Sequence, residues 1–169
     1  MTPNSSYDSR LDRNALTGNV PSNFINLINL DEFFENNLNL TFSLSIQFDM
    51  FSHSPTLCCS NLSHNKLSGP FPNLTGMNSV SYVNLSHNKL SGPFPNLTGM
   101  NSVSYVDLSN NSFEQSEAPA WFSKLSSLTT LVVEYGSFQG TVPYELLGLP
   151  QIQEVNLKNN NFSGILNLS

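Results

Sequence analysis

The chain has 169 residues, of which 11% are charged, and its net charge is −6. It holds six Lys and Arg residues in all, too few for a basic patch that would neutralise phosphates. Nucleic acid and anionic membrane surfaces are therefore poor candidates for partners. The length fits one domain with a continuous core.

The first part of the chain, residues 1–33, is interpreted as an N-terminal tail followed by a partial repeat. Its first ten residues contain no apolar segment of a secretory signal peptide. The partial repeat begins as Leu11-x-x-Asn14-x-Leu16. We expect no membrane span in this chain, because its longest weakly polar stretch, residues 38–51, is short for a bilayer and includes Asn, Gln and Asp.

The second part, residues 34–60, has lost the repeat pattern. Leu16 and Leu67 are equivalent letters 51 residues apart, and this spacing exceeds one repeat step of about 24 residues by the length of the segment. One interpretation is an inserted island that shapes a ligand site. The favoured interpretation is a translated non-coding stretch or a gene-model error that lies outside the regular stack, because long structureless insertions are uncommon in compact domains.

The segment also contains the only two cysteines, Cys58 and Cys59. Adjacent cysteines rarely bridge each other, because a disulfide needs Cα atoms about 5.5–6 Å apart and a trans peptide holds them near 3.8 Å. A redox switch is one interpretation. Two thiols without a function, placed in an irregular segment, are the favoured one.

The third part, residues 61–169, is an array of repeats. Residues 61–83 read NLSHNKLSGPFPNLTGMNSVSYV, and residues 84–106 repeat these letters without a change. The pattern Val-x-Leu-x-x-Asn-x-Leu begins at Val83 and recurs, with substitutions, at Val106, Leu131 and Val155. The steps of 23, 25 and 24 residues match the period of leucine-rich repeats.

Each unit is expected to form a short strand and a turn. Val83 and Leu85 would point inward, and Asn88 would bond the unpaired backbone of the turn. Pro and Gly should keep the return paths irregular or 3-10, with one short helix around residues 118–125. The predicted fold is an α/β leucine-rich repeat solenoid without capping units. Its parallel concave strands should be Tyr82–Ser86, Tyr105–Ser109, Thr130–Glu134 and Glu154–Lys158.

A more specific element, Leu-x-Gly-x-x-Pro, begins at Leu16, Leu67 and Leu90, and with Phe in place of Leu at Phe138. It resembles the plant-specific class of leucine-rich repeats, and residues 107–131 are similar to one subgroup of plant receptor-like kinases. The resemblance implies the extracellular, membrane-tethered part of a receptor whose signalling kinase lies outside this chain. The motifs of a kinase do not occur here, so we expect no enzymatic activity and no cofactor.

The two copies of the unit place His64 and His87 at equivalent positions. Adjacent strands would bring the two imidazoles near each other, as in a metal or pH-sensing site. No Cys or carboxylate stands at a matching spacing. The favoured interpretation is a solvated turn residue that was copied with its unit.

If the chain binds a partner, the concave strand face should carry the contact. The outward tyrosines stand out because rigid aromatics with a polar tip make efficient anchors, although Tyr82 and Tyr105 are also one copied residue that would shield neighbouring strands. Acidic side chains on adjacent units favour a basic peptide or protein surface. The predicted contact residues are Tyr82, Asn84, His87, Tyr105, Asp107, Thr130, Glu134, Tyr135, Glu154 and Lys158.

Nine Asn-x-Ser/Thr sequons occur, as would suit a secreted glycoprotein, but a chain rich in Asn and Ser also produces them by chance. Asn73 and Asn96 lie on the return path and are the expected acceptors. Two functions remain open. The chain is either a binding module for a peptide, a small ligand or a co-receptor, or a truncated structural repeat fragment with no independent activity.

Overall fold

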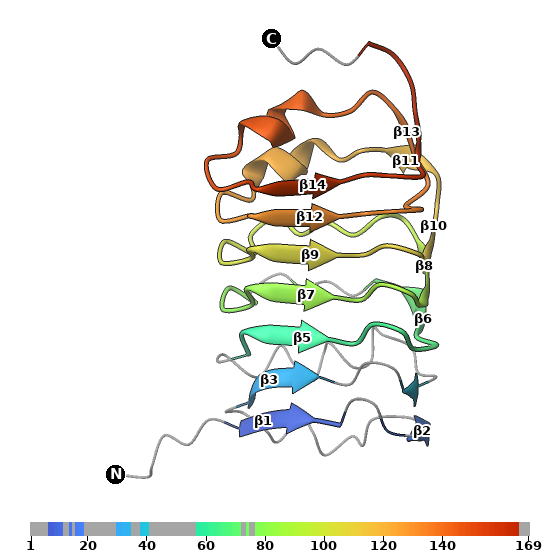
Figure 1. The fold of residues 1–169 in the computed structure, drawn as a ribbon, viewed down its shortest axis with the longest axis vertical. Helices are drawn as coiled ribbons and strands as arrows, with labels where there is room; N and C mark the ends of the chain where they lie inside the picture. Colours follow the sequence, from blue (N-terminus) through green and yellow to red (C-terminus); the bar gives the residue numbers. More distant parts are fainter. Residues whose placement is uncertain are drawn as a thin grey trace.

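The computed structural model describes residues 7–11, 14, 16–18, 30–34, 38–40, 57–71, 74 and 77–165. Its main feature is a parallel sheet of seven strands, stacked one per repeat along the long axis (Figure 1). The strands, in sheet order, are β1 (Tyr7–Arg10), β3 (Leu30–Phe34), β5 (Cys59–Asn61), β7 (Tyr82–Asn84), β9 (Tyr105–Asp107), β12 (Thr130–Val132) and β14 (Glu154–Asn156). The predicted solenoid with short parallel strands is confirmed.

Shorter strands form parallel ladders on the far side of each turn (Figure 1). They are β2 (Thr17–Gly18) with β4 (Asn39–Leu40); β6 (Ser68–Pro70), β8 (Lys89–Gly92) and β10 (Ser112–Phe113); and β11 (Ser116–Glu117), β13 (Phe138–Gly140) and β15 (Asn161–Phe162). Strands β2, β6, β8 and β13 of these ladders coincide with the Leu-x-Gly-x-x-Pro elements or the Phe variant. The glycines at their ends, such as Gly92 at φ 78°, adopt a left-handed conformation that side chains disfavour.

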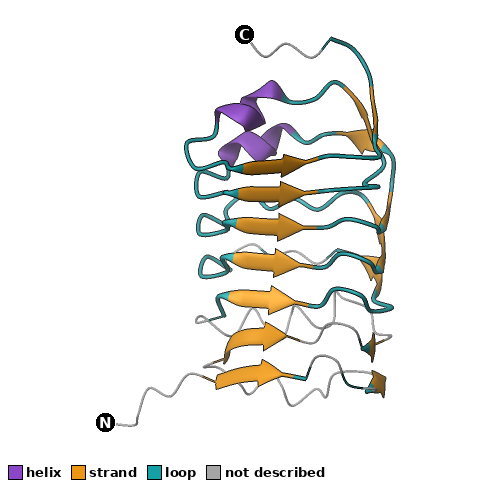
Figure 2. Cartoon of the chain, viewed as in Figure 1, coloured by secondary structure: helices purple, strands orange, loops and turns teal. Residues whose placement is uncertain are grey.

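The return paths are mostly irregular, and the helices in the described part of the chain are 3-10 turns (Figure 2). They are η2 (Ala120–Lys124) and η3 (Tyr144–Gly148). Each follows a proline, Pro119 or Pro143, which fixes φ at the start of the turn. The helix expected around residues 118–125 is therefore present in 3-10 form. No helix among the described residues has the length and apolarity to cross a membrane.

The core lies between the sheet and the return paths. The central residue of β7, β9 and β12 is buried and both neighbours are half-buried, as alternation along a strand requires. The buried central residues are Val83, Val106 and Leu131. Phe122 of η2 is also fully buried, and Trp121 packs against the core from the edge.

Buried asparagines join successive units. Asn88 donates from Nδ2 to the carbonyls of Leu62 and Leu85 at 2.9 and 3.1 Å, and its Oδ1 accepts from the N–H of Leu67 at 3.0 Å. Asn111 makes the equivalent bonds one unit further on. The role predicted for Asn88 is confirmed, and each such side chain satisfies backbone groups of two neighbouring turns at once.

Segment 34–60 differs from the expectation at both of its described ends. Glu32 of β3 pairs with Cys59 of β5, 27 positions later, so the two strands are neighbours in the sheet. Leu38, Leu40 and Leu57 are buried in the common core. The expectation that the whole segment lies outside the stack is wrong for these ends, because their leucines fill the core between β3 and β5. Residues 41–56 lie outside the described residues, and the division into three parts stays a prediction.

Candidate binding face

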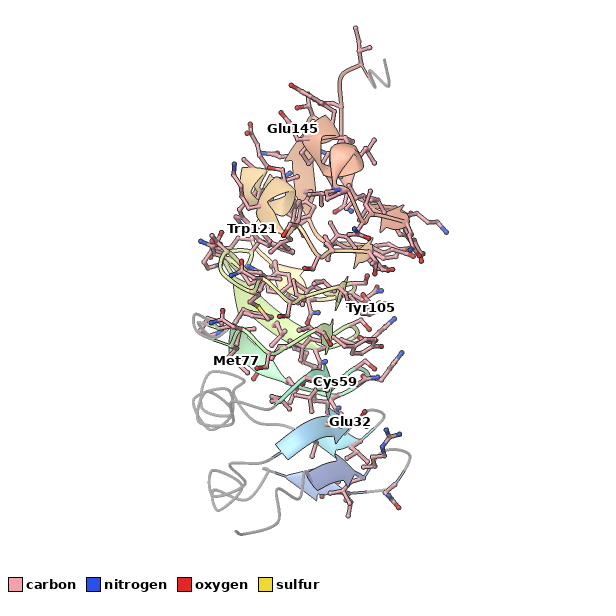
Figure 3. All side chains as sticks on the ribbon, turned by 90° about the vertical axis from the view of Figure 1, so that its left-hand side faces the viewer. Glu32, Cys59, Met77, Tyr105, Trp121 and Glu145 are labelled. Atoms are coloured by element: carbon pink, nitrogen blue, oxygen red, sulfur yellow. The ribbon has the colours of Figure 1, made fainter. Side chains whose placement is uncertain are left out.

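The candidate site is the solvent-facing side of the seven-stranded sheet together with the turn residues that follow each strand, which we call the strand face. In-register pairing arranges its side chains in rows across the strands. Figure 3 shows Glu32, Cys59 and Tyr105 along this side of the molecule, with Met77 and Trp121 on the opposite side.

The ten predicted contact residues fall into four rows on this face. The first row holds Tyr82, Tyr105, Thr130 and Glu154, and the second holds Asn84 and Asp107, continued by Val132 and Asn156. Glu134 and Lys158 lie two residues beyond the second row, and His87 and Tyr135 lie at the turn. His87, Tyr135, Glu154 and Lys158 are exposed, and the other six are half-buried.

The two tyrosines of the first row stack on each other. Their ring centroids are 4.3 Å apart and the rings are 10° from parallel, because register partners on adjacent parallel strands stand about 4.8 Å apart. Burial raises the pKa of Tyr105, and the nearby Tyr82 phenol and Asp107 carboxylate raise it further. The Tyr105 hydroxyl is therefore a neutral hydrogen-bond donor over the physiological range.

The second row also shapes the backbone. Asn84 Oδ1 accepts from the N–H of Ser86 at 3.1 Å and from its Oγ at 2.8 Å. Asp107 Oδ1 accepts from the N–H of Ser109 at 3.0 Å. These bonds turn the chain out of the strand, so Asn84 and Asp107 have a structural role that the sequence did not reveal.

The acidic residues are not equivalent. Glu134 accepts a 2.7 Å hydrogen bond from the Nδ2 of Asn156, which lies on the neighbouring strand β14. This bond fixes the direction of the Glu134 carboxylate. Glu154, in contrast, is exposed at the end of the first row. Asp107 of β9, Glu134 just beyond β12 and Glu154 of β14 lie on three successive units, and we call these three residues the acidic strip.

The turn beyond the strands brings together two histidines. His64 and His87 stack with centroids 4.1 Å apart and rings 11° from parallel. Both have a left-handed backbone, with φ of 55° and 56°. Burial lowers the pKa of His64, the positive charge on His87 lowers it further, and Asp107 opposes them. The predicted proximity is real, but among the described residues no third metal ligand joins this pair.

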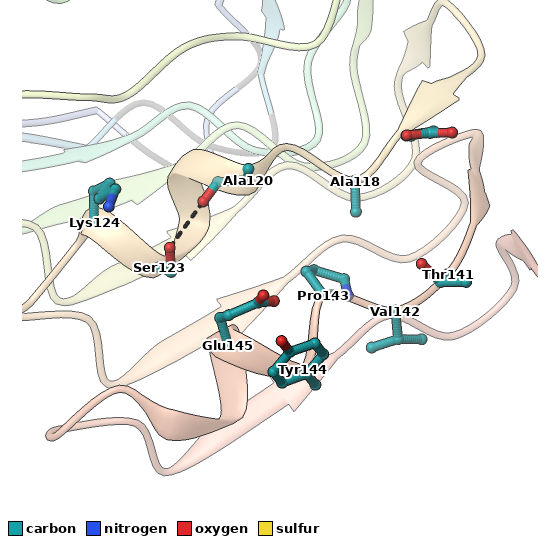
Figure 4. Close-up of a pocket in the computed structure, with 10 residues that line it drawn as sticks. Ala118, Ala120, Ser123, Lys124, Thr141, Val142, Pro143, Tyr144 and Glu145 are labelled. Carbon is teal, nitrogen blue, oxygen red and sulfur yellow. Dashed lines mark hydrogen bonds between the residues drawn. The ribbon is translucent and has the colours of Figure 1, made fainter. Parts of the chain in front are cut away.

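Sequence reasoning missed two further features. Glu32 and Cys59 continue the tyrosine row onto β3 and β5, and the signal for this was a repeat step of 27 residues. A groove of about 450 Å³ also opens between η2 and η3, away from the strand face (Figure 4). Lys124, Tyr144 and Glu145 are among the residues that line it. Of the expected glycan acceptors, Asn96 is exposed, and Asn73 lies outside the described residues.

The comparisons agree with this geometry. The family model of the leucine-rich repeat matches residues 79–100 and 102–125. These residues therefore form leucine-rich repeats.

Solved structures extend the likeness over most of the chain. It is similar to PEPR1 in the PEPR1–AtPEP1 crystal structure, with 28% identity, a TM-score of 0.80, and coverage of 92% of this chain and 22% of that one. It is also similar to the Arabidopsis receptor kinase HAESA in complex with the peptide hormone IDA and the co-receptor SERK1, with 27% identity, a TM-score of 0.79, and coverage of 92% and 26%.

The plant peptide hormone receptor RGFR1 in complex with RGF2 shares the fold, at 24% identity and a TM-score of 0.83, with coverage of 92% of this chain and 24% of that one. The leucine-rich repeat chain thus spans about a quarter of the length of these receptors. The resemblance to the ectodomains of plant receptor kinases is confirmed. The shared fold is a binding scaffold rather than a catalytic one.

Proposed function

We propose that this leucine-rich repeat chain is a binding module of a plant receptor ectodomain, and that it takes a basic peptide or a co-receptor surface on its strand face. The observation that carries the proposal is the stacked Tyr82–Tyr105 pair beside an acidic strip. Aromatic anchors with a polar tip concentrate binding energy, and complementary charge speeds the encounter.

The individual contacts support a peptide as the ligand. Tyr105 and Tyr82 are already ordered by stacking, so little side-chain entropy is lost when a ligand covers them. The carboxylate of Glu134 is directed by Asn156. The exposed Glu154 lies in the same row as Tyr105, two strands away, with Thr130 between them. A Lys or Arg side chain of the ligand would meet these carboxylates next to the aromatic surface.

The setting is taken from the structural neighbours. PEPR1 and HAESA are much longer than this chain, and HAESA is a receptor kinase solved with a peptide hormone. For the parent of this chain we propose an extracellular, membrane-tethered receptor whose kinase lies outside these residues. A glycan at Asn96, which is exposed on the return path, would leave the strand face open; Asn73 carries the same sequon.

The test compares two matched double variants. Tyr105→Ala with Glu134→Ala removes an anchor and a carboxylate from the strand face, whereas Tyr144→Ala with Glu145→Ala removes the same side-chain types from η3. Binding is measured by biolayer interferometry against immobilised synthetic peptides rich in Lys and Arg, with acidic peptides of equal length as probes of charge.

We expect the basic peptides to bind and the strand-face variant to weaken binding at least tenfold, while the η3 variant binds as the unchanged chain does. Loss of binding in the η3 variant alone would place the contact on the opposite side. A folded chain that binds none of the peptides would support the second function, a structural repeat fragment with no independent activity.

A further inference from the structure

A second cluster of reactive side chains lies at the β3–β5 end of the strand face. It consists of Glu32, Cys58 and Cys59, whose ligand atoms all lie within 4.8 Å of one another. The sulfurs of the two cysteines are 2.9 Å apart, and neither forms a disulfide. No other group of three such ligands occurs among the described residues.

The sheet itself creates this cluster. Glu32 and Cys59 are direct register partners on β3 and β5, so their side chains leave the sheet on the same face, about 4.8 Å apart along the hydrogen-bonding direction. Cys58 precedes the strand, where the alternation of faces does not yet apply, and its sulfur lies beside that of Cys59. Residues that are 27 positions apart in the sequence thus become neighbours through one strand pairing.

The backbone of the cluster is held firmly. The carbonyl of Cys58 accepts hydrogen bonds from the N–H groups of Ser81 and Tyr82 at 2.7 and 3.1 Å, and from Ser81 Oγ at 3.2 Å. Arg10 of β1 forms an ion pair with Glu32 through Oε2. An outer partner of this kind orients a metal ligand, and a carboxylate has a second oxygen, Oε1.

We propose that Glu32, Cys58 and Cys59 bind a thiophilic divalent cation of the Zn²⁺ type, with a fourth coordination position open to the strand face. Two sulfur ligands and one carboxylate are a donor set that zinc accepts, and a three-ligand site keeps a position for water or a partner side chain. Binding converts both thiols to thiolates and releases two protons. The site then carries one net negative charge, which Arg10 balances.

The distances allow this with side-chain motion alone. At a zinc–sulfur distance of about 2.3 Å and a tetrahedral angle, the two sulfurs stand about 3.8 Å apart. The sulfurs of Cys58 and Cys59 therefore have to separate by about 0.9 Å, which rotation about their χ1 torsions supplies. A disulfide between the same residues would instead have to distort the trans peptide, which holds the Cα atoms about 3.8 Å apart. The site does not depend on the peptide-binding proposal.

The site would also link two repeats. A cation held by Glu32 and the two cysteines ties β3 to β5 across the longest repeat step in the sheet. Because the cation binds the folded chain and the ligands are far apart in the unfolded one, it should raise the temperature of unfolding. The open position lies beside Tyr82, the register partner of Cys59 on the other side.

The experiment uses the full chain, reduced and freed of metal, and titrates it with Cd²⁺ and Zn²⁺. Binding of Cd²⁺ is followed by the ultraviolet thiolate-to-metal charge-transfer band, and binding of Zn²⁺ by calorimetry and by the shift of the unfolding temperature. The variants are Cys59→Ser, Cys58→Ser and Glu32→Gln. Arg10→Gln removes the ion pair but keeps all three ligands, and His64→Asn with His87→Asn tests the other candidate metal ligands.

We expect one cation per chain. The serine variants should lose the charge-transfer band or most of it, and Glu32→Gln should keep the band but lower the affinity at least tenfold. The arginine variant should bind less than tenfold more weakly, and the histidine variant should bind as the unchanged chain does. Absence of the band in the reduced chain, equal affinity in Glu32→Gln, or loss confined to the histidine variant would each overturn the proposal.

Discussion

Among substitutions of polar side chains in the array, Asn88→Ala should be one of the most destabilising. The Asn88 amide donates to the carbonyls of Leu62, Leu85 and Ser86, and it accepts from the N–H of Leu67. The side chain is only 9% exposed. After truncation, water has poor access to the backbone groups that the amide satisfied.

The expected magnitude follows from these orphaned groups. A buried donor or acceptor left without a partner costs about 1–3 kcal/mol. Asn88→Ala leaves the N–H of Leu67 without a partner and removes a 2.9 Å hydrogen bond from the carbonyl of Leu62. Both backbone groups belong to the preceding unit. We therefore expect a loss of about 2–4 kcal/mol. Asn88→Asp keeps the acceptor but loses the donors, and it should be damaging as well because it buries a charge.

The loss is measured by urea unfolding, with the midpoint and slope compared between variants. The matched control is Asn101→Ala, which truncates an exposed asparagine on the return path of the same unit and should change stability by less than about 0.5 kcal/mol. If Asn88→Ala costs no more than this control, the buried amide does not link the repeats in the way the hydrogen bonds imply.

Three further outcomes are expected. Ser60→Val should stabilise the chain by about 1–2 kcal/mol, because Ser60 Oγ is buried without a partner in the described structure; a lower urea midpoint would show that the site is too small. Gly136→Ala should cost about 1–3 kcal/mol, because its Cβ would lie 2.4 Å from Val133 Cγ1; thermal unfolding unchanged by the substitution would contradict the clash. The pKa of His64 lies below its usual value of 6.5, so the unfolded chain binds more protons at this residue than the folded chain does. The contribution of His64 to stability is therefore fully present above about pH 6.5 and should be lost as the pH falls through the folded pKa. NMR titration of His87→Asn should find the pKa of His64 raised but still held below 6.5 by burial; an unchanged pKa would refute the electrostatic coupling.

The regular part of the fold could be predicted from the sequence because the residue types at fixed repeat positions determine its local geometry. The duplicated unit fixed the repeat register without ambiguity, and the strand centres Val83 and Val106 followed from it. The asparagine contacts followed too, since a buried amide next to a turn has few partners other than the backbone. The 3-10 form of η2 was within reach because Pro119 precedes it and the segment is short.

The strand face was predictable as a set of positions but not as a set of interactions. Alternation tells which side chains point outward, and pairing in register tells which ones meet. The Tyr82–Tyr105 stack follows from the duplication. The bond from Asn156 to Glu134 does not, because it depends on the directions of two flexible side chains on different strands. The sequence therefore predicts that the strip is acidic, but not the directions in which its carboxylates point.

The expectation failed at the two described ends of segment 34–60 because the motif residues differ there while the apolar side chains remain. Leu38 stands where the later units have the buried asparagine, and Ser60 stands where they have Val83. A search for the repeat motif does not detect a unit with these substitutions. The core can still form there, because Leu38, Leu40 and Leu57 are buried in it.

A spacing that exceeds one repeat step by the length of the segment does not distinguish an insertion from a diverged repeat. Phe34 pairs in register with Asn61, so removing residues 34–60 takes out one full turn, and the remaining letters join in the correct phase. Any complete turn of a solenoid has this property, because each turn ends at the position where it began. The excess spacing therefore shows only that the segment is one repeat step long. The buried leucines at both described ends belong to the core, and whether residues 34–60 as a whole are an insertion or a diverged repeat stays a prediction.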